Sequence, residues 1–117
     1  MVALVGRNET KNSKRIMTKK EYNGWFNYET WLVKLWIDND QGSQSYWQEQ
    51  AEEFYKVDAD DCSGLADALK EHHEEYLSSI MPDSGFAADL MSAAMSEVNW
   101  REIAESLIND AKEAVEA

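Results

Sequence analysis

The chain has 117 residues, 44% of them hydrophobic, which is enough sequence for one domain around a single core. No apolar run approaches the roughly 20 residues that span a bilayer, and the lone Cys62 cannot form an internal disulfide, so composition argues against a membrane protein and a disulfide scaffold. A net charge of -12 disfavours direct binding to nucleic acid or to membrane phosphate, because both are anionic.

Residues 1–20 differ from the rest of the chain in charge. They carry six basic side chains against the single acid Glu9, a charge of +5, whereas the other 97 residues carry five basic and 22 acidic side chains, a charge of -17. They also lack periodicity and an apolar face, as flexible tails do. We therefore expect a basic, disordered tail over 1–20 and an acidic helical domain over 21–117. The tail is either a solvated extension or a nucleic-acid contact.

The first predicted helix covers about residues 28–39, with Asn27 as its N-cap. Its large apolar side chains include Tyr28, Trp31, Leu35 and Trp36. They occupy so much of the circumference that the helix should be buried at the centre of the fold. Glu29 falls inside the apolar arc, where a buried carboxylate needs partners. It is either a cap that fixes the helix entry or an acid in a tryptophan-lined binding cleft.

The second predicted helix covers about residues 44–57 and follows a polar stretch. In that stretch Gly42 tolerates a positive φ, and Ser43 or Ser45 can cap the helix. Its apolar side chains recur at the helical i, i+4, i+7, i+8 spacing. They are Trp47, Ala51, Phe54 and Tyr55. This pattern predicts an amphipathic helix with one buried face.

A polar connection from Asp58 to Gly64 precedes the third predicted helix, which ends near Met81-Pro82. The inner face of this helix carries Leu65, Leu69, His72, Tyr76 and Ile80. The fourth predicted helix, about 86–97, has Phe86, Leu90, Ala93 and Ala94 along one side, and Val98 continues that side past its end. Its many small residues predict close packing against another helix.

The fifth predicted helix opens with Asn99 and Glu102, a pair close to a capping box. Its buried face carries Trp100, Ile103, Ala104, Leu107, Ile108 and Ala111. Nothing in the chain reads as a strand. The patterns together predict an all-α fold, a single-domain compact bundle of about five helices around the Trp-rich helix 28–39.

No motif of a common enzyme is present, so we expect no enzymatic activity, cofactor or metal. The adjacent His72 and His73 diverge by about 100° on a helix, whereas metal sites use i, i+4 pairs. An EF-hand loop starting at Asp58 would place Ser63 at the turn glycine and Leu69 at the bidentate glutamate. Cys62 follows acidic residues that disfavour a thiolate.

Acidic side chains cluster on the outer faces of three predicted helices. They are Glu49, Glu52, Glu53, Asp67, Glu71, Glu74, Glu75, Glu102, Glu105 and Glu113. Carboxylates three or four positions apart on a helix have β-carbons about 5–6 Å apart, close to the separation of neighbouring phosphates. Such rows either imitate a DNA backbone or serve only to keep the protein soluble.

One segment of the chain carries a family resemblance. The stretch Asn27-Tyr28-Glu29-Thr30-Trp31, followed by Leu35-Trp36-Ile37 and by Asp38-Asn39-Asp40 with Gly42, resembles a family of small uncharacterised proteins of phages, plasmids and some bacteria and archaea. The resemblance implies a mobile-element setting and no particular activity. In size, acidity and helicity the chain is also similar to phage DNA-mimic antirestriction proteins, although no motif carries that likeness.

These observations predict a non-enzymatic inhibitor that binds a basic, nucleic-acid-handling host protein, in the cytoplasm of the host if the protein is viral. The lone cysteine fits such a reducing compartment. The alternative is a small-ligand or peptide-binding module with one cleft walled by Trp25, Trp31, Trp36 and Trp47. The residues expected to build the fold are Asn27, Tyr28, Glu29, Trp31, Leu35, Trp36, Trp47 and Trp100. Met91 and Met95 mark the candidate surface for a homodimer.

Overall fold

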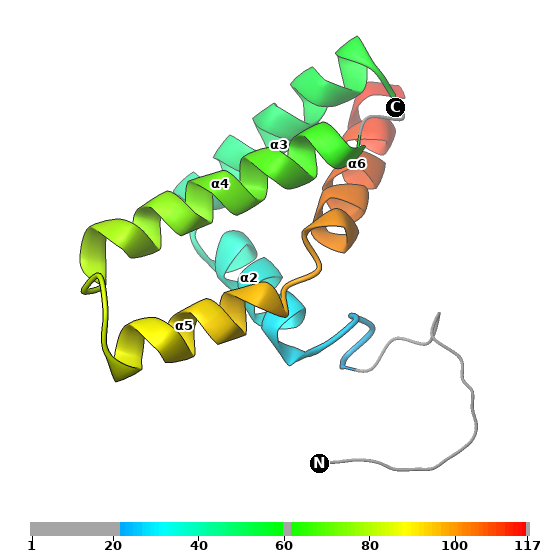
Figure 1. The fold of residues 1–117 in the computed structure, drawn as a ribbon. Coiled ribbons are helices and arrows are strands. Elements are labelled where there is room, and N and C mark those ends of the chain that lie inside the picture. The colour runs from blue at the N-terminus through cyan, green and yellow to red at the C-terminus, as the bar shows by residue number, and fades with distance from the viewer. Residues whose placement is uncertain (1–21, 60–61, 117) are drawn as a thin grey trace.

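The computed structural model describes residues 22–59 and 62–116, and the predicted tail over 1–20 lies outside these ranges. The described residues form five helices and no strand (Figure 1). The helices are α2 (Tyr28–Asn39), α3 (Gln41–Val57), α4 (Cys62–Ile80), α5 (Phe86–Ser96) and α6 (Trp100–Glu116). The predicted all-α bundle of five helices is therefore confirmed. None of these helices is long and apolar enough to cross a membrane.

Two helices begin at the predicted asparagine caps. The Asn27 Oδ1 accepts the Thr30 N–H of α2 at 2.9 Å, and the Asn99 Oδ1 accepts the Glu102 N–H of α6 at 3.1 Å. Each bond satisfies one of the backbone donors that a helix leaves unpaired in its first turn. The positions of these two caps therefore follow from local sequence alone.

The start of α3 differs from the prediction. The Asp40 carboxylate accepts the Ser43 N–H at 3.0 Å, so the helix begins at Gln41 and Gly42 lies inside it. Neither Ser43 nor Ser45 is the cap, and Gly42 does not end the preceding helix. An aspartate satisfies first-turn donors as well as a serine does and also favours the positive helix end, which explains the earlier start.

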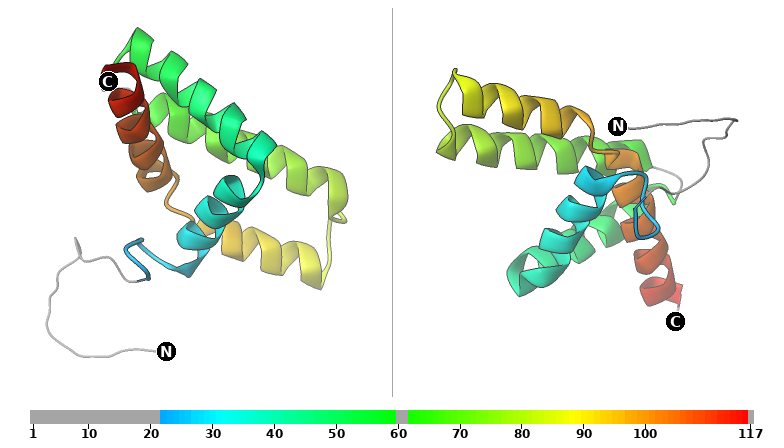
Figure 2. Two further views of the ribbon diagram at one scale, coloured as in Figure 1. Left: turned by 180° about the vertical axis from the view of Figure 1, so that it is seen from behind. Right: turned by 90° about the horizontal axis from the view of Figure 1, so that it is seen from below.

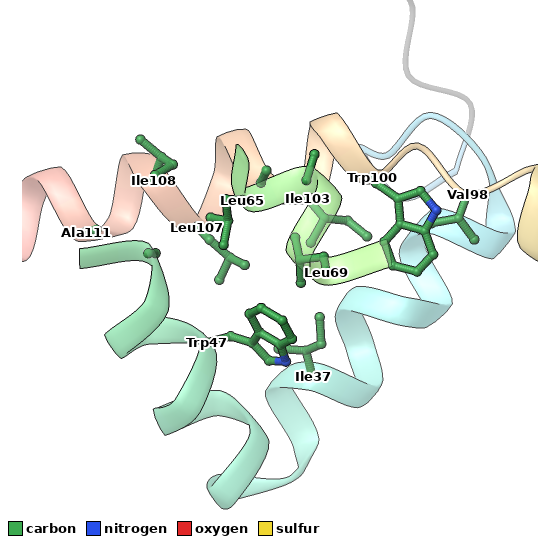
Figure 3. Packing of buried hydrophobic residues seen from close by; sticks show 13 residues of the cluster. Ile37, Trp47, Leu65, Leu69, Val98, Trp100, Ile103, Leu107, Ile108 and Ala111 are labelled. Carbon is green, nitrogen blue, oxygen red and sulfur yellow. The ribbon is translucent and has the colours of Figure 1, made fainter. Parts of the chain in front are cut away.

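The centre of the bundle is α6, which packs extensively against both α3 and α4. Figure 2 shows α6 crossing the pair that α3 and α4 form. The predicted buried face of α6 is correct, since Trp100, Ile103, Ala104, Leu107, Ile108 and Ala111 are all at most 9% exposed. Figure 3 shows Leu107 of α6 pointing toward Trp47 of α3, which lies beside Ile37 of α2. Burying each large aliphatic side chain contributes about 1.5–3 kcal/mol.

The predicted position of α2 at the centre is wrong, because α2 lies on one side of α3 and α6. Only Thr30, Lys34 and Ile37 of α2 are buried, whereas Trp36 is 66% exposed. Of the other residues expected to build the fold, Trp47 and Trp100 are buried, Trp31 and Leu35 are half-buried, and Tyr28 is exposed. A helix that is apolar all round does not have to be buried all round.

The buried polar residue at the start of α2 is Thr30, while the neighbouring Glu29 is half-buried. The Thr30 hydroxyl donates to the Asn27 Oδ1 at 2.6 Å and accepts the Asn99 N–H at 2.8 Å. The Asn27 Nδ2 donates to the Glu97 carbonyl at 2.6 Å. This network joins the first turn of α2 to the connection between α5 and α6, so the helix entry is fixed by Thr30 rather than by Glu29.

The apolar stripe of α4 extends beyond the bundle. Leu65 and Leu69 are fully buried, but further along the same stripe Tyr76 is 59% exposed and Ile80 is 58% exposed. The connection from α4 to α5 lies at the opposite end of the molecule from the C-terminus (Figure 1). The last turn of α4 therefore has no bundle helix among the described residues to cover its apolar side.

The close packing predicted for α5 is absent, since α5 has no buried residue and packs extensively on no other described helix. Phe86 is 82% exposed and Leu90 is 59% exposed, so the predicted apolar side of α5 faces solvent. Met91 and Met95 are half-buried and line a hollow of about 500 Å³ between α5 and α4. We call the second half of α4 together with α5 the arm.

Candidate partner-binding surfaces

Nine of the ten predicted surface acids lie on the outside of α3, α4 and α6. Eight are exposed, and Glu52 is half-buried. On α3 they are Glu49, Glu52 and Glu53, on α4 they are Asp67, Glu71, Glu74 and Glu75, and on α6 they are Glu105 and Glu113. We call these nine residues the acidic surface. They stand outward because the opposite stripe of each helix is held in the core.

Within the described residues, few cations pair with these carboxylates. Within residues 22–59 and 62–116 there are two ion pairs, Lys34 with Asp38 at 2.7 Å and Arg101 with Glu105 at 3.2 Å. Glu105 is thus the one member of the acidic surface with a cationic partner in the part of the chain that the structure describes. The remaining carboxylates present their charge to solvent and to any approaching protein.

Glu102 is the exception among the predicted surface acids, because it is only 8% exposed. Its Oε1 accepts the Phe26 N–H at 2.9 Å, which ties the turn before α2 to the first turn of α6. In a capping box the Asn99 N–H would donate to the Glu102 carboxylate. Here it donates to the Thr30 hydroxyl instead. Glu102 is therefore a structural residue, and its assignment to a partner surface was wrong.

A second surface feature is a groove of about 450 Å³ between α2, α3 and α4. Its lining includes Trp36, Tyr46, Trp47, His72, His73 and Tyr76, which we call the aromatic groove. Trp36, Tyr46 and Tyr76 are 66%, 45% and 59% exposed, while Trp47 is 2% exposed. Three helices thus supply open aromatic walls, and a buried indole supplies the floor.

Ring contacts hold the histidines of the groove in place. The His72 ring stacks on Tyr46 with centroids 5.8 Å apart, and the His73 ring lies between Trp47 at 6.0 Å and Trp100 at 5.4 Å. The His73 Nδ1–H donates to the Leu69 carbonyl at 2.7 Å. Both histidines therefore act as packing groups.

Burial lowers the pKa of His73, and this effect outweighs the opposing influence of the Leu69 carbonyl. The neighbouring His72 lowers the pKa of His73 further. At neutral pH the His73 ring is consequently uncharged, and the floor of the groove carries no positive charge there. No group of three metal-ligating side chains occurs among the described residues.

The four tryptophans of the predicted cleft do not meet in one place. Trp36 and Trp47 share the aromatic groove. Trp25 lines a different hollow, of about 700 Å³, beside α3 and α6. Trp31 packs on Tyr22, with ring centroids 5.0 Å apart. The groove was therefore not predicted. A domain this small has little core to cover the three tryptophans between residues 25 and 36, and that signal could have indicated an exposed one.

The remaining candidate residues lie at the start of α4 and in the segment before it. Cys62 is half-buried at the start of α4 and lines the hollow that holds Trp25. In the same hollow the Tyr55 hydroxyl donates to the Glu116 carboxylate, a hydrogen bond that raises the pKa of Tyr55. Asp58 is exposed, and the adjoining Asp60 and Asp61 lie outside the described residues.

The comparisons with known proteins place the chain in a family without giving it an activity. No curated protein and no solved structure matches the chain. The model of one family matches residues 18–116, which is nearly the whole chain and includes all five helices. The chain therefore belongs to DUF7249, a family of unknown function.

Proposed function

We propose that this chain is a non-enzymatic inhibitor whose acidic surface occupies the basic, nucleic-acid-binding site of another protein. The observation that carries the proposal is the acidic surface itself: nine carboxylates on three packed helices, of which only Glu105 has a cationic partner within the described chain. A surface that serves only solubility can intersperse charges of both signs. On these three helices acidic side chains outnumber the basic Lys56, Lys70, Arg101 and Lys112.

The charge of the acidic surface attracts a basic protein before the two make contact. Like-signed carboxylates on a rigid scaffold raise association rates with an oppositely charged partner by roughly 10–1,000-fold at low salt. The Debye length is about 8 Å at physiological ionic strength, so the attraction weakens as salt is added. A basic partner is therefore recognised first through charge, and salt sensitivity is the expected signature of the complex.

The spacing of the carboxylates supports a partner that handles nucleic acid. On α4, Asp67, Glu71 and Glu74 follow each other at i, i+4 and i+7, which places neighbouring β-carbons about 5–6 Å apart. This is close to the separation of successive phosphates along a strand. The backbone of an α-helix fixes that spacing, as a rigid mimic of a DNA backbone requires.

The resemblance of the Asn27–Gly42 segment to proteins of mobile elements supports a target in host defence, of the restriction or CRISPR type. The same proposal places the protein in the cytoplasm, where Cys62 stays reduced. It also excludes direct nucleic-acid or membrane binding by the folded body, because the charge of -17 over residues 21–117 repels phosphate.

A small-ligand or peptide-binding module is the second candidate function. The observation that favours it is the aromatic groove, where Trp36, Tyr46 and Tyr76 remain open to solvent. The two candidates need not exclude each other, since a basic partner can place one of its side chains in the groove.

The proposal is tested by capture of partners from a host lysate on the immobilised protein, with and without added duplex DNA. Proteins whose capture is lost in the presence of DNA are then purified and titrated against the parent chain and a variant with Glu71→Gln, Glu74→Gln and Glu75→Gln. We expect the variant to bind more weakly and with a smaller salt dependence. Undiminished affinity in excess DNA or in raised salt would exclude mimicry.

A further inference from the structure

We propose that the aromatic groove binds the guanidinium group of an arginine side chain from the basic partner. This inference rests on the proposed function, because it takes from it that the partner presents a basic surface. It adds a specific anchoring site to what is otherwise a long-range electrostatic attraction.

The shape of the groove fits a single long side chain. Its volume of about 450 Å³ lies in the range of roughly 300–1,000 Å³ that is typical of pockets for small molecules. Trp36 of α2, Tyr46 of α3 and Tyr76 of α4 line the groove and remain exposed, although one face of the Tyr46 ring is stacked on His72. Exposed Trp and Tyr residues beside a pocket are the residue types in which interface energy concentrates.

The charges that face the groove favour a cation. Asp40 lines the groove, and its position is fixed because its Oδ2 accepts the Ser43 N–H at 3.0 Å. That carboxylate also offsets the partial positive charge of the α3 N-terminus. The other titratable groups facing the groove are Tyr46, Tyr76, His72 and His73, and burial keeps His73 uncharged at neutral pH.

The chain already holds one cation by the same combination of groups. The Lys34 ammonium lies 6.0 Å from the centroid of the Trp25 ring and pairs with the Asp38 carboxylate at 2.7 Å. In the groove, rings and a carboxylate are likewise adjacent, but the chain supplies no cation to them within the described residues. Arginine suits such a site better than lysine, because its flat, weakly hydrated guanidinium stacks on aromatic faces.

The test uses isothermal titration of the full chain with an octa-arginine peptide and with an octa-lysine peptide of equal charge. General attraction to the acidic surface acts on both peptides, and guanidinium groups also pair with carboxylates more tightly than ammonium groups do. The part of the affinity ratio that the groove variants remove therefore isolates the groove. We expect the arginine peptide to bind about 3- to 30-fold more tightly, and Trp36→Ala or Tyr76→Ala to remove most of that preference. Tyr28→Ala is the matched control, since Tyr28 is 47% exposed on the same helix as Trp36 but outside the groove.

An equal affinity of the parent chain for the two peptides would overturn the inference. So would an undiminished preference in both groove variants, provided that circular dichroism shows them folded, or an equal loss in Tyr28→Ala. The variant with Glu71→Gln, Glu74→Gln and Glu75→Gln separates the two proposals. This variant should weaken the binding of both peptides, while Trp36→Ala made in it should still reduce the preference for arginine. If the variant weakened the binding of neither peptide, the proposed function would fail while the groove inference stood.

Discussion

The first turn of α2 depends on the buried hydroxyl group of Thr30. Replacing Thr30 with valine tests that dependence. Thr30→Val keeps the shape of the side chain and removes two hydrogen bonds, one to the Asn27 Oδ1 at 2.6 Å and one from the Asn99 N–H at 2.8 Å. The Asn27 Oδ1 keeps its bond from the backbone N–H of residue 30. The Asn99 N–H, by contrast, loses its acceptor.

The magnitude follows from these two losses. Leaving the partly buried Asn99 N–H without an acceptor costs about 1–3 kcal/mol. Losing the bond to the Asn27 Oδ1, which keeps another donor, costs about 0.5–1.5 kcal/mol. We expect a total of about 2–3 kcal/mol, a large share of the roughly 5–15 kcal/mol that stabilises a domain. For a domain of this size such a loss lowers the melting temperature by roughly 8–24 °C.

The assay is urea-induced unfolding followed by circular dichroism, with Thr30→Ser as the matched variant. The serine keeps the hydroxyl and removes one buried methyl group, for an expected loss of about 1 kcal/mol. The dependence on urea should stay unchanged in both variants, because the surface exposed on unfolding is the same. If valine cost less than about 0.5 kcal/mol, or less than serine, packing rather than hydrogen bonding would hold this junction.

Three further predictions concern the stability of the fold and test His73, Glu102 and Phe86. Burial lowers the pKa of His73 in the folded state, so below about pH 6.5 the unfolded chain binds more protons than the folded chain does. The free energy of unfolding should therefore fall as the pH drops below that value. Denaturation at several pH values should show a smaller fall in His73→Gln. An unchanged slope in that variant would contradict the assignment. Glu102→Ala should lower the free energy of unfolding in urea by about 2–3 kcal/mol, because it removes the hydrogen bond from Phe26. Glu105→Ala, at an exposed position on the same helix, should lower it by at most about 0.5 kcal/mol. Equal losses in the two variants would refute the distinction between a buried and an exposed acid. Phe86→Ala should change the free energy of unfolding by at most about 0.5 kcal/mol, since Phe86 is 82% exposed. A larger loss of unfolding free energy that grows with protein concentration would instead show that the arm forms a homodimer.

Local signals predicted the helices and two of their caps. Asn27 and Asn99 cap α2 and α6 as expected, because an N-cap depends on residues within three positions of itself. The buried stripe of α6 was also readable, since its apolar residues recur at helical spacing along one face only.

The sequence could not show which apolar residues find a covering partner. Trp36 belongs to an apolar helix, and Ile80 belongs to a correct apolar stripe, yet both are exposed because no other helix of the described chain covers them. The same limit applies to polar residues. Thr30 and Glu102 are buried through contacts with residues about 70 positions away, and no local pattern encodes those contacts.

The central claim is that the acidic surface and DNA compete for one site on the partner. The most direct test is a titration of the purified partner with this protein at several concentrations of duplex DNA and at constant salt. We predict that the apparent dissociation constant rises linearly with the DNA concentration and without a plateau, as mutual exclusion requires. A dissociation constant that stays the same when DNA saturates the partner would contradict the claim.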